Sequence, residues 1–171
     1  MKTILLSATL VAISLSPGLL KSAELDNRTL GKEAIERQLA HVSAPIKTQT
    51  DLRDYLAIST EGSTRLDALS PGARQRFVQS LVFTEKGLAS FDYRDIQSEL
   101  TASEIYQLLS LFGAQRSTGV IPSPRVETPT DAAIMDLVNE LPPFADYPDY
   151  ECKSRATCSG RVGSICIGAN C

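Results

Sequence analysis

The chain lacks several features on which familiar catalytic functions depend. It has no tryptophan, a single histidine (His41), and no cysteine before Cys152. The nucleophile, zinc-protease, phosphate-binding and dinucleotide-binding motifs are all missing. His41 is expected near the C-terminal end of a helix, where an imidazole is a common structural residue. We therefore predict no catalytic residue, no enzymatic activity and no cofactor.

The charge of the chain is also not that of a nucleic-acid-binding protein. Its 17 basic and 20 acidic side chains give a net charge of −3. Nucleic-acid binding normally requires a broad basic face, often with aromatic residues between the basic ones, and no stretch of this sequence has that pattern. We expect no nucleic-acid partner.

The N-terminal residues have the pattern of a secretory signal peptide. Lys2 supplies a positive start, residues 4–15 are mostly apolar, and Pro17 and Gly18 follow before small residues at 22 and 23. The apolar run is shorter than the roughly 20 residues that a membrane-spanning helix needs. We expect cleavage near residue 23, a secreted or periplasmic mature protein, and no stable membrane anchor after cleavage.

All four cysteines lie in the last twenty residues, with five, seven and four residues between them. An even number of cysteines in an exported protein predicts disulfide bridges, here two. Three pairings are open. The tail has no C-x-x-C pair and no histidine, so we predict no metal site. The predicted disulfide residues are Cys152, Cys158, Cys166 and Cys171.

The middle of the chain predicts helices. Thr101 and Glu104 form a capping box before apolar residues at helical spacing, and Ser70 with Pro71 marks another helix start. Apolar residues on one side of residues 28–41 predict a first amphipathic helix. We assign Leu88 and Phe91 to a loop. The expected fold is an all-α bundle of five or six short helices followed by a disulfide-closed tail.

This gives four predicted parts: a signal peptide (1–23), a helical domain (24–141), an acidic linker rich in proline and tyrosine (142–151) and a cysteine-rich tail (152–171). Residues 131–151 contain six acidic residues and no basic one, whereas the tail contains three basic residues and no acidic one. We predict a non-enzymatic interaction module that presents the tail to a protein partner. The candidate contact residues are Tyr147, Tyr150, Lys153, Arg155 and Arg161.

An alternative function fits the same layout. The helical domain would be a pro-region, and the tail would be released as a small cysteine-rich, bacteriocin-like antibacterial peptide. Against this alternative, no Gly-Gly pair and no dibasic site precedes Cys152.

Intact mass measurement of the exported protein tests both hypotheses. We expect one species that starts near residue 23 or 24 and gains four alkyl groups only after reduction. A small species containing only the tail would instead support the peptide precursor.

Overall fold

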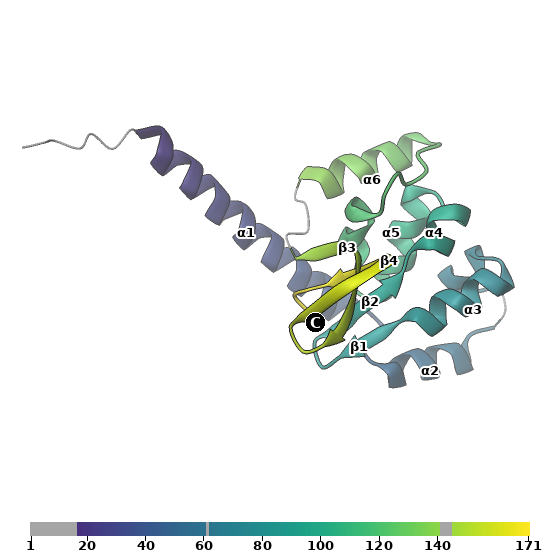
Figure 1. The fold of residues 1–171 in the computed structure, drawn as a ribbon. Coiled ribbons are helices and arrows are strands. Elements are labelled where there is room, and N and C mark those ends of the chain that lie inside the picture. The colour runs from purple at the N-terminus through teal and green to yellow at the C-terminus, as the bar shows by residue number, and fades with distance from the viewer. Residues whose placement is uncertain (1–16, 61, 141–144) are drawn as a thin grey trace, which may run out of the picture.

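The chain folds into helices packed around a four-stranded antiparallel sheet (Figure 1). The computed structural model describes residues 17–60, 62–140 and 145–171, with side chains from residue 29 onward. Residues 1–16 of the predicted signal peptide and residues 142–144 of the predicted linker therefore lie outside the described part. In chain order the elements are α1 (Pro17–Ser43), α2 (Gln49–Ile58), the 3-10 helix η1 (Arg65–Ala68), α3 (Pro71–Ser80), β1 (Val82–Thr84), β2 (Gly87–Asp92), α4 (Arg94–Glu99), α5 (Ala102–Ser110), the 3-10 helix η2 (Gln115–Val120), α6 (Pro129–Glu140), β3 (Asp146–Ser154) and β4 (Thr157–Ile167).

The predicted all-α fold is wrong, because the molecule combines these helices with a sheet. The strand order is β1-β2-β4-β3, so β2 and β4 lie inside the sheet. Phe91 of β2 pairs with Ile165 of β4, and the flanking residues continue this antiparallel register. The C-terminal tail thus joins the centre of the sheet.

The β1–β2 hairpin was not predicted, because buried and exposed residues do not alternate along β2. Residues 87–91 are all buried, and a strand covered on both faces shows no period of two. Directly after the turn, Gly87 has a positive φ of 112°. A residue with a side chain would be strained in this backbone conformation. Leu88 and Phe91, assigned to a loop from sequence, are strand residues in the main core.

The helix signals in the sequence were more informative. The Thr101–Glu104 capping box is present, and Ile105, Leu108 and Leu109 on α5 are fully buried. Helix α3 begins at Pro71 as predicted. Helix α2 is capped by Thr48, whose hydroxyl accepts from the backbone N–H of Asp51.

The main core is organised around three phenylalanines from different elements. Phe77 on α3 makes edge-to-face contacts with Phe91 on β2 and with Phe112 after α5, at centroid distances of 6.3 and 6.2 Å. Ile165 and Ile167 of β4 belong to the same core and are fully buried. Residues from the start of α2 to the last strand therefore share one core.

Helix α1 contacts this body through its charged side. Its C-terminal half lies beside the sheet while the rest projects outward (Figure 1). Arg37 donates to Asp146 of β3 at 3.2 Å, and the hydroxyl of Ser117 donates to the same carboxylate at 2.6 Å. Burial raises the pKa of Asp146. The apolar side expected to pack inward instead faces solvent, with Ile35 and Leu39 more than 60% exposed.

Among the described residues, no helix combines the length and the apolar character needed to cross a membrane.

Because β4 contributes to the main core, we expect a core substitution in this strand to destabilise the whole protein. Ile165→Ala is expected to lower the free energy of unfolding by about 2–5 kcal/mol, because it leaves a cavity in the shared core. Val162→Ala, on the same strand but 81% exposed, is the matched control and is expected to change stability by less than about 0.5 kcal/mol. Urea denaturation followed by helical circular dichroism measures both. Equal, small effects would show that the tail is separable from the helices.

Candidate functional site

The C-terminal hairpin of β3 and β4 carries the residues that the sequence singled out. A two-residue turn at Arg155 and Ala156 joins the strands, and Ala156 has a positive φ of 57°. The backbone N–H of Ala156 donates to the carbonyl of Cys171 at 2.8 Å. The end of the described chain is thereby held beside the turn.

Both predicted disulfides are present, and the structure settles the pairing that the sequence left open. Cys152 on β3 is bonded to Cys171, and Cys158 is bonded to Cys166 within β4. The Cα atoms of Cys158 and Cys166 are 6.0 Å apart, although eight residues of straight strand would span roughly 26 Å. The chain of β4 therefore bends sharply between Cys158 and Cys166, and the second disulfide closes this bend.

The bend in β4 lies opposite Asp149 of β3. Pro148 pairs with Ile165 while Tyr150 pairs with Gly160, so residues 161–164 form a bulge without partners on β3, although Ser164 pairs with Asp92 of β2. Gly163 in this bulge has a φ of 87°, and a Cβ there would lie 2.5 Å from the side chain of Arg94. Only glycine fits this position without movement of Arg94.

A hydrogen-bonded clamp holds the bulge against the body of the protein. The hydroxyl of Tyr93 donates to Asp149 at 2.8 Å, and the N–H of Gly163 donates to the same oxygen at 2.9 Å. The N–H of Tyr93 donates in turn to the carbonyl of Gly163 at 2.8 Å. Burial raises the pKa of Tyr93 to about 12, and the bond to Asp149 acts in the same direction.

Two half-exposed tyrosines, Tyr147 and Tyr150, flank Asp149 in the sequence of β3. The rings of Tyr147 and Tyr150 are 6.3 Å apart, and 46% and 44% of the two residues are exposed. They line a cavity of about 500 Å³, which we call the tyrosine hollow. A Cβ on Gly168 would lie 2.8 Å from the ring of Tyr147, so glycine permits this close approach. The other lining residues are Ala145, Ala156, Cys158, Gly168 and Ala169.

The three predicted basic contact residues have different surroundings. Lys153 and Arg161 both form ion pairs with Glu151, and hydrogen bonding from Lys153 is the largest cause that lowers the pKa of Glu151. Arg155 lines a second cavity of about 330 Å³, the Arg155 hollow, with residues that include Lys86 and Cys171. Glu151 thus offsets part of the charge of the tail, and Arg155 and Lys86 lie next to a cavity.

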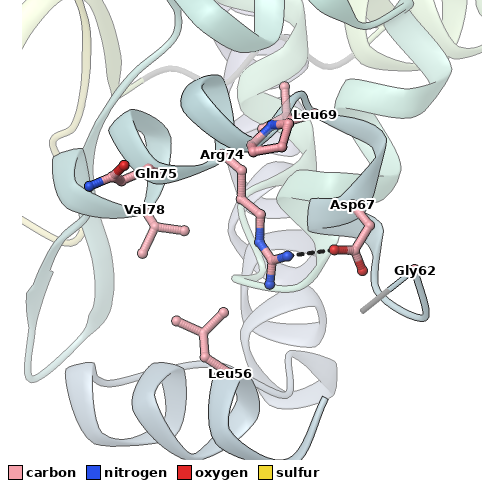
Figure 2. Close-up of a pocket in the computed structure, with 8 residues that line it drawn as sticks. Leu56, Gly62, Asp67, Leu69, Arg74, Gln75 and Val78 are labelled. Carbon is pink, nitrogen blue, oxygen red and sulfur yellow. Dashed lines mark hydrogen bonds and ion pairs between the residues drawn. The ribbon is translucent and has the colours of Figure 1, made fainter. Parts of the chain in front are cut away.

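A third cavity of about 500 Å³ lies between α2, η1 and α3 (Figure 2). Its walls include Leu56, Leu69 and Val78, and Arg74 forms an ion pair with Asp67 at 2.5 Å within it. Hydrogen bonds from Thr64 lower the pKa of Asp67. No sequence motif marks this cavity, because its residues come from α2, η1, α3 and the segments between them.

His41 lies at the C-terminal end of α1, as predicted. It packs beside Gly87, where an added Cβ would be 3.1 Å from its Nδ1 atom. It also lines a cavity of about 420 Å³ together with Glu33, Arg37 and Lys86. Its environment is therefore the charged contact between α1 and the sheet.

Three of the cysteine sulfurs are as close together as the ligands of a metal site would be. The Sγ atoms of Cys152, Cys166 and Cys171 lie within 4.8 Å of one another. All four cysteines are oxidised in disulfides, so none offers the thiolate that a metal requires.

Comparison with known proteins adds no assignment, since no family model, curated protein or solved structure matches the chain.

The clamp predicts the titration of one tyrosine. Of the five tyrosines in the chain, Tyr93 is expected to ionise with a midpoint of about 12. Because its pKa is raised in the folded state, the stability from neutral Tyr93 is present below about pH 10 and is lost as the pH rises towards 12. Ultraviolet titration of tyrosinate measures this late phase. Its persistence in Tyr93→Phe would contradict the assignment.

Proposed function

We propose that this protein is an exported, non-enzymatic interaction module that binds a partner protein through the β3–β4 hairpin. The observation that carries the proposal is the pair of half-exposed tyrosines beside a cavity on a hairpin with two disulfides. Tyrosine is enriched among the residues that dominate protein–protein binding energy, because it offers a large contact area and a polar end.

The restraints on the hairpin favour binding. Disulfides and the Tyr93 clamp limit the conformations of the free hairpin, so less entropy is lost when a partner binds. The hollow forms where β3 packs against the turn after β4, with Gly168 donating its N–H to Ala145. A partner would therefore meet a preformed surface.

Charge indicates the kind of partner segment. Lys153 and Arg161 share Glu151, which leaves one net positive charge, and Arg155 adds another, although the whole chain has a net charge of −3. A segment that places an apolar side chain in the tyrosine hollow and a carboxylate near Arg155 complements this surface. Electrostatic complementarity of this kind mainly raises the association rate.

The two disulfides support an extracellular or periplasmic location, because such bridges persist in oxidising compartments. The signal-like N-terminus favours the same location. The released-peptide alternative receives less support, since Ile165 and Ile167 of the tail are buried in the main core. A released tail would expose both side chains.

A comparison of matched variants tests the binding surface. The double variant Tyr147→Ala/Tyr150→Ala is expected to weaken partner binding at least about tenfold, as loss of 1.4 kcal/mol or more at hot spots implies. The control Ile58→Ala/Val126→Ala removes exposed apolar residues outside the hairpin, which are 82% and 51% exposed. Exported fractions are passed over each immobilised protein, and recovered proteins are then measured by binding titration. A partner that binds all three forms equally would contradict this surface.

Charge variants form a separate test. Lys153→Ala/Arg155→Ala/Arg161→Ala is expected to lower the association rate and to reduce its dependence on salt, while the helices stay folded. Stopped-flow or surface kinetics at two salt concentrations measures this effect. An unchanged rate would remove the basic residues from the contact surface.

A further inference from the structure

The two disulfides are close enough to react with each other. Cys166 belongs to one disulfide, yet its Sγ atom lies within 4.8 Å of both sulfurs of the Cys152–Cys171 disulfide. A disulfide bond is about 2.05 Å long. A sulfur displacement of less than about 3 Å would therefore bring Cys166 into bonding contact with either neighbour.

We infer that this pair of disulfides is a thiol-exchange site, which accepts an external thiolate at Cys158 and passes the exchange to Cys152–Cys171. The substrate class is a thiol, either a small molecule or a protein cysteine. The inference rests on the sulfur positions and does not depend on the proposed partner surface.

Exposure selects Cys158 as the entry point. Cys158 is partly exposed and lines the tyrosine hollow, whereas Cys166 is completely buried. An incoming thiolate therefore attacks the sulfur of Cys158. A bond forms between the external sulfur and Cys158 Sγ, the Cys158–Cys166 bond breaks, and Cys166 leaves with the electron pair as a thiolate.

The second step uses the neighbouring disulfide. The Cys166 thiolate attacks Cys152 or Cys171, a new disulfide forms, and the other sulfur leaves as the thiolate. This step converts one disulfide and one thiolate into a new disulfide and a new thiolate, so it needs no further oxidant or reductant. Cys171 lines the Arg155 hollow with Lys86 and Arg155, and positive charge favours a thiolate.

A substrate with two thiols would complete a net reaction. Its second thiolate attacks the substrate sulfur bonded to Cys158, which releases the substrate as a disulfide and leaves Cys158 as a thiolate. The substrate loses two electrons and the protein gains one pair of thiols in place of a disulfide.

Two single-cysteine variants of the full chain test the second step. Cys158→Ser leaves Cys166 free beside the intact neighbour, so the free thiol is expected to spread over Cys152, Cys166 and Cys171. Cys166→Ser instead leaves Cys158 free, which is outside the group of three close sulfurs. Its free thiol is expected to remain on Cys158, which makes this variant the matched control.

Alkylation at pH 8 followed by tryptic peptide mapping locates the free thiol. Cleavage after Lys153 and Arg161 separates Cys152 from the peptide that contains Cys166 and Cys171, and fragmentation distinguishes those two. In Cys158→Ser we expect at least about one label in ten away from Cys166, as for pairings within 1.4 kcal/mol. Label confined to Cys166, or equal spreading in Cys166→Ser, would overturn the inference.

The unaltered protein gives an independent test of the entry point, which holds even where a variant fails to fold. Limiting reduced glutathione is added, the reaction is quenched by alkylation, and the glutathione adduct is mapped. The first adduct is expected on the peptide that ends at Arg161 and contains Cys158. Adducts that appear first on Cys152 or Cys171 would overturn the assignment of Cys158.

Discussion

The antiparallel pairing of β4 with β2 is the contact on which the rest of the structure depends. It places Ile165 and Ile167 in the same core as Phe77, Phe91 and Phe112. It also fixes the position of β3, which pairs only with β4 in the sheet order β1-β2-β4-β3. The cysteine-rich segment is therefore part of the structural centre, and the surface that it presents is positioned by the main core.

The hairpin combines this firm attachment with a local departure from regular strand geometry. The bulge at residues 161–164 lies opposite Asp149, where Tyr93 and Gly163 meet the same carboxylate. In the same part of the hairpin the rings of Tyr147 and Tyr150 contact each other, and Cys166 lies close to the other disulfide. One irregular region thus underlies both the proposed binding surface and the proposed exchange site.

The sequence predicted helices far better than strands, and the reason is physical. The Thr101–Glu104 box and the Pro71 start are local signals, and both helices begin there. The strands β2 and β4 depend on each other across more than seventy residues, and their buried stretches show no alternation. Of the candidate site, the cysteines and tyrosines were recognisable by residue type. The disulfide pairing, the Tyr93 clamp and the cavities require three-dimensional proximity that no local pattern contains.

The place of β4 in the chain has a consequence for synthesis. A ribosome makes β2 long before β4, so the nascent chain holds β2 with one side unpaired until residues 164–166 emerge. Throughout that interval Phe91 lacks its strand partner, and an unpaired strand edge readily associates with other chains. The fold of such a chain is completed only once residues 164–166 have been made, and until then the open edge of β2 can associate with other chains or with chaperones.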